Sequence, residues 1–238
     1  LRVIKAGDGT LHPVEARFLR PEIHNFRDFN RLVVSRADAG GLVLWVGDEK
    51  KILHGTAVLK YLRYGEQEPF GSRKSGSLPP AERPTCNNRE PWYDLTKSTR
   101  GQMIWAKSEQ YKHQVVFNPE GVAPNSRLYD VSFLGELATH PEFMAGIVNS
   151  TAVALFKTFY GRYTGVEGAF ELMVIDANLL EVPDPRGTPA KLRRRIAEAF
   201  IALAARPTEQ MLTDELLQCH SPEQAEKLAQ TPLVLPRE

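Results

Sequence analysis

The stretch "GQMIWAKSEQYKHQVVFNPEGVAPNSRLYDVSF", residues 101–133, carries the clearest evidence for the fold class. It contains three short runs rich in β-branched and aromatic residues, at Gln102–Trp105, Gln114–Phe117 and Arg127–Phe133. Such runs, separated by Gly, Pro, Asn and Ser, are typical of strands joined by turns. Along the whole chain, strand and helix patterns interleave irregularly rather than in strict alternation. We therefore expect an α+β fold with a mixed or mainly antiparallel sheet and packed helices.

Two helices are predicted directly after these strands, in "ATHPEFMAGIVNSTAVALFKTFYGRYTG", residues 138–165. Thr139 and Glu142 have the spacing of a capping box and predict the start of the first helix. Ser150 is expected to cap the second helix, and Gly161 to end it.

Before residue 101, the pattern predicts a strand, a turn, a helix and a long loop. The apolar run Leu42–Val46 reads as a strand, and Gly47-Asp48 reads as a turn leading to Ile52-Leu53, so that a hairpin or sharp turn is expected. Val58, Leu59 and Leu62 recur at helical spacing and predict a helix that ends near Gly65. Residues 66–91 are rich in Pro and Gly and are expected to form a loop.

After the second helix of residues 138–165, "AFELMVID", residues 169–176, predicts a strand and "EVPDPRGTP", residues 181–189, an exit linker. Thr188-Pro189 predicts the start of a tail helix with one apolar stripe, formed by Leu192, Ile196, Phe200 and Leu203. Two further short helices are expected to start at Pro207-Thr208 and Ser221-Pro222. We accordingly divide the chain into a domain of residues 1–186 and a helical tail of residues 187–238.

The net charge of +1 conceals an uneven distribution of charged residues. Between Lys50 and Arg127 there are 13 basic and 7 acidic residues, whereas residues 128–238 hold 10 basic and 15 acidic ones. A basic segment flanked by neutral and acidic ones is compatible with a polyanionic partner, and equally with an ordinary solvated surface.

Cysteine content and hydropathy limit the class of protein. The two cysteines, Cys86 and Cys219, form no paired motif, so neither a disulfide framework nor a structural zinc site is expected, and a reducing, cytoplasmic location is favoured. No apolar run approaches the roughly 18 residues that span a membrane. The N-terminal residues do not form a signal peptide, and because the sequence begins at Leu1 rather than Met, we expect the chain to be part of a longer protein.

The stretch "NNREPWYDL", residues 87–95, places an arginine and two large aromatic residues close together next to a loop-like region. The aromatics could anchor the loop to a core, or they could stack on a ligand. We expect Trp92 and Tyr93 to be buried against the sheet and Arg89 to point from the loop.

A second function is suggested by Asp48 and Lys50, with further acidic residues upstream at Glu22, Asp28 and Asp38. Metal-dependent nucleases use paired carboxylates to bind the cation and a nearby lysine to contact the scissile phosphate. The same spacing also suits a turn at the end of a strand. A metal-dependent nuclease therefore remains an alternative, as does a non-catalytic assembly module that binds a partner subunit through its helical tail.

A series of segments, in this order, resembles the specificity region that follows the catalytic domain in adenine-specific DNA methyltransferases of restriction–modification systems. The resemblance covers roughly residues 10–186 and rests on "FLRPEIHNFRDFNRLVV", "LKYLRYGE", "NNREPWYDL", "GQMIWAK", "VVFNPEG", "LYDVSFL", "GIVNSTAVALFKTFYGR" and "GAFELMVIDANLLEVPDP". In that family this region is an α+β target-recognition domain, and Arg89 with Trp92-Tyr93 matches a recurrent element of it. The family's catalytic Asn-Pro-Pro-aromatic motif is missing here, because Glu120 and Gly121 follow Asn118-Pro119.

The resemblance implies that the chain binds double-stranded DNA next to an upstream methyltransferase catalytic domain, in restriction–modification or phage defence. The parent enzyme would use S-adenosylmethionine, whereas no cofactor and no catalytic residue is expected on this chain. Phosphate contacts are expected from basic residues and base contacts from a few Arg, Asn or Gln side chains. The candidate DNA-binding residues are Lys50, Lys51, Lys60, Arg63, Arg73, Lys74, Arg89, Arg100, Lys107, Lys112 and Arg162.

Overall fold

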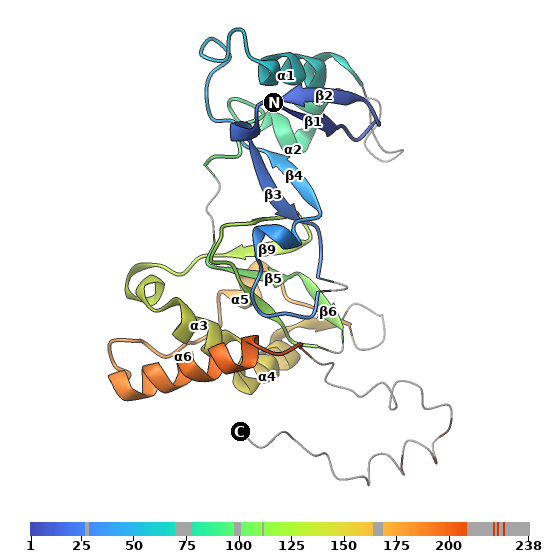
Figure 1. Cartoon of the computed structure of the whole chain (residues 1–238). Helices are drawn as coiled ribbons and strands as arrows, with labels where there is room; N and C mark the ends of the chain where they lie inside the picture. The colour runs from blue at the N-terminus through green and yellow to red at the C-terminus, as the bar shows by residue number, and fades with distance from the viewer. Residues whose placement is uncertain are drawn as a thin grey trace. The chain divides into compact units, whose positions relative to one another are not determined.

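The computed structural model describes residues 1–26, 29–69, 78–97, 101–110, 112–163 and 169–208, together with positions 221, 223 and 226 (Figure 1). The fold is α+β, as expected. Most strand pairs are antiparallel, and β3 (Leu19–Ile23) pairs with β8 (Ala123–Pro124) in parallel.

The chain divides into two compact units, and each unit is built from segments that are distant in sequence. Unit 1 consists of Leu1–His24, Val34–Gly101 and Asn118–Ser126, and unit 2 consists of Asn25–Val33, Gln102–Phe117 and Arg127–Glu238. The expected functional division into residues 1–186 and 187–238 stays a prediction.

Unit 1 contains a β-hairpin and a small mixed sheet. In the hairpin, β1 (Arg2–Lys5) pairs antiparallel with β2 (Leu11–Val14). In the sheet, β3 lies between β8 and β4 (Gly41–Leu44). The predicted strand at Leu42–Val46 therefore exists as β4. Of the two forms expected after it, a hairpin or a sharp turn, the hairpin is wrong and the turn is present. β4 pairs with β3, which precedes it, and residues 51–55 form turns instead of a returning strand.

The main helix of unit 1, α1 (Ala57–Gln67), confirms the helix predicted from Val58, Leu59 and Leu62. Thr56 caps it by accepting a hydrogen bond from the Leu59 nitrogen at 3.2 Å. The carboxylate of Glu15 accepts from the backbone nitrogens of residues 57 and 58 at 2.7 and 2.9 Å, so that several first-turn N–H groups are satisfied. The apolar face of α1 packs on β2 and forms the core of the unit with Phe18, Val46, Leu53 and Tyr93.

The segment expected to be a loop, residues 66–91, is more structured than predicted. α1 continues to Gln67, a 3₁₀ turn spans Pro80–Glu82, and the short helix α2 spans Pro84–Asn87. The prediction missed these turns because prolines at the first helical position favour helix starts as well as loops.

Unit 2 is built on two three-stranded sheets. In one, β5 (Met103–Ala106) lies between β7 (Val115–Phe117) and β9 (Leu128–Val131), and both pairs are antiparallel. These are the three strands predicted in residues 101–133; β5 is shifted by one residue, and β7 and β9 are shorter than expected. In the other, β11 (Ala169–Glu171) lies between β10 (Arg162–Tyr163) and β6 (Ser108–Gln110).

The two predicted central helices are present as α3 (Pro141–Val148) and α4 (Thr151–Tyr160). The capping box at Thr139 is wrong, because its hydroxyl donates to the Glu136 carbonyl and closes a 3₁₀ turn instead. Ser150 caps α4 as expected, accepting from the Val153 nitrogen at 3.5 Å. Gly161 ends α4 with an ordinary negative φ, and a Cβ there would collide with the carbonyl of Lys157.

The strand predicted over residues 169–176 ends early. β11 stops at Glu171, and α5 (Val174–Ala177) follows, with the carboxylate of Asp176 accepting from the Met173 nitrogen at 3.3 Å. This local hydrogen bond stabilises a helix start at Met173, and such side-chain bonds are not taken into account when a strand is predicted from β-propensity.

The tail helix, α6 (Ala190–Ala204), confirms the prediction from Pro189 onward. It packs on α3, where Gly146 has no side chain and lets Ile196 and Phe200 approach closely. Phe200 is buried in the core of unit 2, whereas Leu192 remains partly exposed. The helices predicted beyond Pro207 fall on residues 209–220 and around position 222, outside the described residues.

Candidate nucleic-acid interface

The segment Asn87–Lys97 of unit 1 is anchored by its two aromatic residues. Trp92 Nε1 donates to the Glu66 carboxylate at 2.8 Å, and the Trp92 ring lies against Gly65 of α1. Tyr93 is buried, and its hydroxyl donates to the Asp48 carbonyl at 2.9 Å. Both aromatics therefore anchor the segment, as expected, although Trp92 is half-buried against α1 rather than buried against the sheet.

The other end of the segment is closed by polar contacts. Asp94 is buried and accepts hydrogen bonds from Thr96, at 2.6 Å from the hydroxyl and 2.8 Å from the backbone nitrogen. The Thr96 hydroxyl, followed by its backbone N–H and the charge of Lys97, holds the pKa of Asp94 below its usual value. Lys97 Nζ also donates to the Glu90 carbonyl at 3.0 Å. The turn at Asn88–Glu90 is consequently held from both directions.

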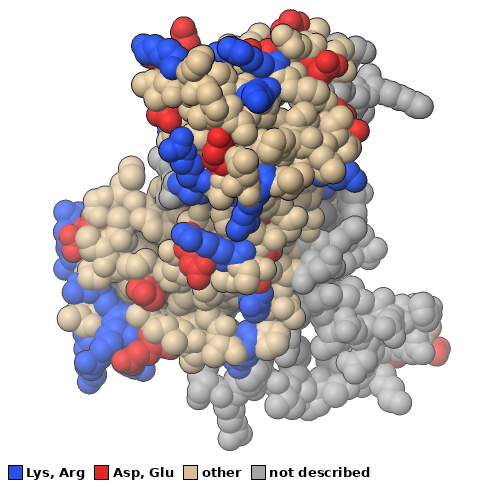
Figure 2. Space-filling model, turned by 45° about the horizontal axis from the view of Figure 1, so that its top comes forward, with Lys and Arg blue, Asp and Glu red and all other residues tan. Residues whose placement is uncertain are grey.

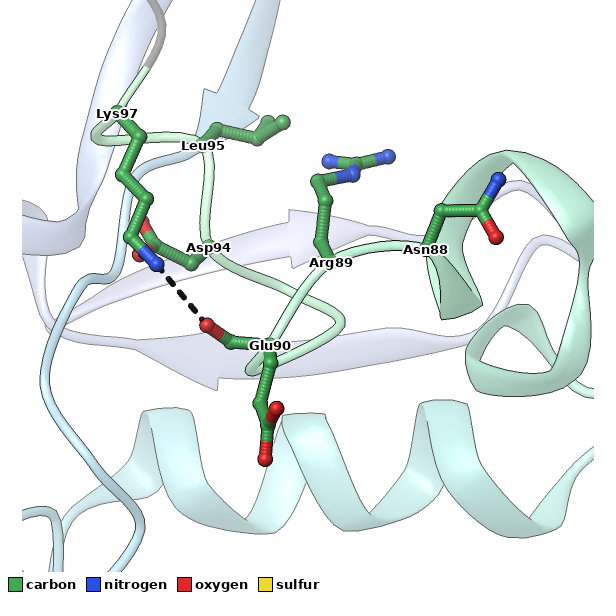
Figure 3. Close-up of a pocket in the computed structure, with 6 residues that line it drawn as sticks. All are labelled: Asn88, Arg89, Glu90, Asp94, Leu95 and Lys97. Carbon is green, nitrogen blue, oxygen red and sulfur yellow. Dashed lines mark hydrogen bonds and ion pairs between the residues drawn. The ribbon is translucent and has the colours of Figure 1, made fainter.

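Two hollows border this turn. One, of about 470 Å³, is lined by Asn88, Arg89, Glu90, Asp94, Leu95 and Lys97 (Figure 3). The other, of about 540 Å³, shares Asn88, Arg89 and Glu90 and is also lined by Lys50, Trp92 and Tyr93. Two of the residues predicted from the sequence to bind DNA, Arg89 and Lys50, therefore line the same hollow.

Arg89 is half-buried, so it projects less freely than expected. Its Nη2 donates to the Thr85 carbonyl at 2.6 Å and lies 3.8 Å from Cys86 Sγ. In Figure 3 its guanidinium lies on the same side of the turn as the Asn88 amide, whereas the Glu90 carboxylate points to the opposite side. Asn88 was not among the candidates named from the sequence. Its position directly before Arg89 in "NNR" could have identified it.

The remaining candidates of unit 1 fall into three groups. Lys50 forms an ion pair with Glu66, and Lys51 lies 2.6 Å from the Glu49 carboxylate. Lys60 and Arg63 are exposed on α1 and have no ion-pair partner in the described part of the chain. Three further candidates lie outside the described residues, namely Arg73, Lys74 and Arg100.

The three candidates of unit 2 each have a partner within that unit. Lys107 Nζ lies 5.1 Å from the centre of the Tyr129 ring. Lys112 Nζ donates to the Phe29 carbonyl at 2.7 Å, and Arg162 lies 3.3 Å from the Asp176 carboxylate. Their role in DNA binding stays a prediction.

The two units also differ in net charge, although by less than the segments of the sequence do. Unit 1 holds 15 basic and 12 acidic residues, a net charge of +3, whereas unit 2 holds 15 and 17, a net charge of −2. Figure 2 shows Lys and Arg spread over the visible face with acidic residues among them, rather than gathered in a single basic field.

The environment of Asp48 and Lys50 offers no set of metal ligands. The Asp48 carbonyl accepts from Tyr93, and the ammonium group of Lys50 is paired with Glu66. Within the residues that the structure describes, no three His, Cys, Asp or Glu side chains are grouped so that they could hold a metal ion. None of the described helices has the length and apolar character needed to cross a membrane.

Sequence reasoning also missed a buried ionic cluster in unit 2. Lys157 of α4 forms an ion pair with Glu109 of β6, and both side chains are about 95% buried. The Glu109 carboxylate also accepts from Trp105 Nε1 at 3.4 Å and from the Gln114 nitrogen at 3.2 Å. The partners are 48 positions apart, so no local pattern reveals the pair.

Comparison with known proteins gives a likeness in fold. No protein-family model matches the chain, and no curated protein matches it. Among solved structures, the fold is similar to that of the type IIG restriction endonuclease BpuSI, with a TM-score of 0.53 and 12% identity over 91% of this chain. The match covers 26% of the enzyme's chain, so this chain spans about a quarter of the length of that protein. At this identity the likeness establishes the fold.

Proposed function

We propose that this chain is a DNA-binding recognition module of a restriction–modification protein and that it contacts duplex DNA through unit 1. The observation that carries the proposal is the likeness in fold, over nearly the whole chain, to part of a restriction endonuclease. The net positive charge of unit 1 and the anchored polar turn at Asn88–Glu90 support it.

In this proposal the residues of unit 1 divide the work. Lys60 and Arg63 contact phosphates, because they are exposed and have no ion-pair partner in the described part of the chain. The turn at Asn88–Glu90 approaches a groove. Methyl transfer from S-adenosylmethionine to adenine belongs to a catalytic domain of the parent protein, and this chain supplies neither the cofactor site nor the catalytic residues.

The direct test measures the affinity of the chain for duplex DNA by fluorescence anisotropy over a range of salt concentrations. Each phosphate contact releases counterions, so the affinity should fall steeply as salt rises. The variant Lys60→Ala/Arg63→Ala should have a salt slope smaller by about two. Lys191→Ala, at an exposed position of unit 2, is the matched control and should leave the slope unchanged. Absence of salt-sensitive binding by the wild type would end the proposal.

An assembly module is the second candidate, and the surface of unit 2 favours it. Leu155, Phe159 and Tyr160 of α4 are 53%, 80% and 55% exposed. A groove of about 340 Å³ lies beside them, lined in part by Phe156, Leu179 and Leu180. Exposed apolar patches mark interaction sites, and a partner subunit could cover this one. Light scattering of the wild type and of Phe159→Ser tests self-association. If the wild type is monomeric at all concentrations, the surface does not bind a second copy.

A further inference from the structure

We infer that the turn at Asn88-Arg89 reads base edges in a groove of DNA, with Arg89 contacting guanine and Asn88 the neighbouring base pair. The inference rests on the proposed function and assigns a chemistry to one part of it. It depends on three features of the turn: the charges around it, the orientation of Arg89, and the rigidity of its support.

The charges around the turn suit a base edge better than a phosphate. The hollow in Figure 3 is lined by two basic residues, Arg89 and Lys97, and by two acidic ones, Glu90 and Asp94. Asp94 retains its negative charge, since hydrogen bonds from Thr96 lower the pKa of its carboxyl group. A phosphate entering the hollow would meet no excess of positive charge. A base pair presents donors and acceptors together and carries no net charge, so it fits this mixed lining.

Arg89 can offer one bidentate edge to a base. Its Nη2 donates to the Thr85 carbonyl at 2.6 Å and more weakly to Cys86 Sγ at 3.8 Å. Both bidentate edges of the guanidinium use Nη2, one together with Nε and one together with Nη1, so guanine would take the edge whose Nη2 hydrogen points to the sulfur and replace that weak contact. Neither Nε nor Nη1 has a hydrogen-bond partner among the described residues. Guanine offers two adjacent acceptors, O6 and N7, which match such an edge.

Asn88 is placed to contact the next base pair. Its amide is exposed and lies on the same side of the turn as the Arg89 guanidinium. Consecutive Cα atoms are about 3.8 Å apart, close to the roughly 3.4 Å spacing of bases along a strand. An asparagine amide pairs with adenine N6 and N7 in the same way that arginine pairs with guanine. The two side chains together would select guanine and adenine at adjacent positions.

The support of the turn is rigid, as specific recognition requires. Trp92 and Tyr93 bind it to Glu66 and to the Asp48 carbonyl, and Lys97 binds its Glu90 carbonyl. The bond to Thr85 fixes the guanidinium itself before DNA arrives. Groups held in place in this way lose less conformational entropy on binding. They also cannot move to form hydrogen bonds with an incorrect base.

The test is selection of binding sites from a library of random DNA duplexes by the whole chain, followed by sequencing. The wild type should enrich a motif that contains an invariant G·C pair next to an A·T pair. Arg89→Ala should lose the preference for that G·C pair while the rest of the motif persists. Its affinity for the selected site should fall roughly 5- to 150-fold, with little change in the salt slope. Arg89→Lys retains the charge but lacks the planar fork of donors, so it should weaken the preference for that G·C pair while leaving the salt slope unchanged.

Lys60→Ala is the matched control, because it should weaken binding to all sequences and leave the motif unchanged. Circular dichroism should show that each variant remains folded; if Arg89→Ala does not, Arg89→Lys decides the question. An unchanged motif in the Arg89 variants would overturn the inference and leave the proposed function standing. So would a uniform loss of affinity with a salt slope smaller by about one, since that is the result expected for a phosphate contact. Failure of the wild type to bind any duplex would instead refute the proposed function itself.

Discussion

Units 1 and 2 differ in where particular charged and apolar side chains lie. Unit 1 holds polar side chains at the surface of an anchored turn, and its exposed basic residues on α1 have no described ion-pair partner. Unit 2 buries the Glu109–Lys157 ion pair and exposes an apolar face on α4. The units contain equal numbers of basic residues, so the difference lies in how those residues are used. The comparison favours DNA contact in unit 1 and a structural or assembly role in unit 2.

The largest effect is expected from breaking the buried pair of unit 2. Lys157→Met leaves the Glu109 carboxylate buried without its counter-charge, in a site where burial already raises its pKa. The free energy of unfolding should fall by about 3–5 kcal/mol, measured by chemical denaturation. The double variant Glu109→Gln/Lys157→Met should recover much of this loss. Lys191→Met, at an exposed position, is the control and should change stability by less than about 0.5 kcal/mol.

If Lys157→Met were as stable as the wild type, the pair would not be part of the core as described. An unchanged affinity for DNA in the folded double variant would sharpen the comparison, since unit 2 would then contribute stability without contacting DNA through this cluster.

The next effect concerns the anchor of unit 1. Trp92→Ala removes a half-buried ring, its contact with Gly65 and the hydrogen bond to Glu66. Stability should fall by about 3 kcal/mol, the lower end for truncation of a tryptophan, because the ring is not fully buried. Trp92→Phe retains part of the packing and should lose less. A stable Trp92→Ala variant that fails to bind DNA would instead identify the ring as a stacking surface.

A pH-dependent effect is expected in unit 2. Burial, with a further contribution from the charge of Lys157, lowers the pKa of His113 from 6.5 to about 4. Between these values the unfolded chain takes up a proton that the folded chain does not. The free energy of unfolding should therefore decrease as the pH falls, by about 2 kcal/mol between pH 7 and pH 5 for this residue.

Glu109 acts in the opposite direction, because burial raises its pKa and the folded state takes up a proton more readily as the pH falls. Measuring the free energy of unfolding of the wild type and of His113→Gln at each pH isolates the contribution of the histidine. The stability difference between wild type and variant should shrink as the pH falls from 7 to 5. A constant difference would show that His113 titrates normally in the folded protein.

The smallest effect is expected for single exposed lysines. Lys60→Ala should leave stability within about 0.5 kcal/mol of the wild type. The affinity for duplex DNA should fall modestly and equally for all sequences, with a salt slope smaller by about one. A change in sequence preference would mean that α1 contacts bases, and the division of work between α1 and the Asn88–Glu90 turn would have to be reversed.

Local patterns predicted the parts of the fold that depend on local physics. The spacing of Val58, Leu59 and Leu62 was sufficient for α1, and the runs in residues 101–133 were sufficient for three strands. The partner of β4 could not be predicted, because strand pairing depends on contacts distant in sequence. The strand at β11 was predicted, but its early end was missed because Asp176 caps a helix where apolar, β-prone residues favoured a continued strand.

The candidate site was predictable to a similar extent. The anchoring of Trp92 and Tyr93 followed from two large aromatics beside a polar segment. Arg89 was expected to point from the loop; it is half-buried at the edge of two hollows, and its contact with DNA stays a prediction. The pairing of Lys50 with Glu66 and of Lys112 with the Phe29 carbonyl was not foreseeable. These contacts join residues 16 and 83 positions apart, and a count of charges along the sequence treats such lysines as equally available.

The most direct test of the account compares the reactivity of two exposed lysines, Lys60 in unit 1 and Lys191 in unit 2, toward an acetylating reagent. Modification of each is measured by mass spectrometry with and without saturating duplex DNA, and again at high salt, where binding is lost. We predict that DNA protects Lys60 at low salt and leaves Lys191 unchanged. Protection of Lys191 with no protection of Lys60 would contradict the assignment of DNA binding to unit 1.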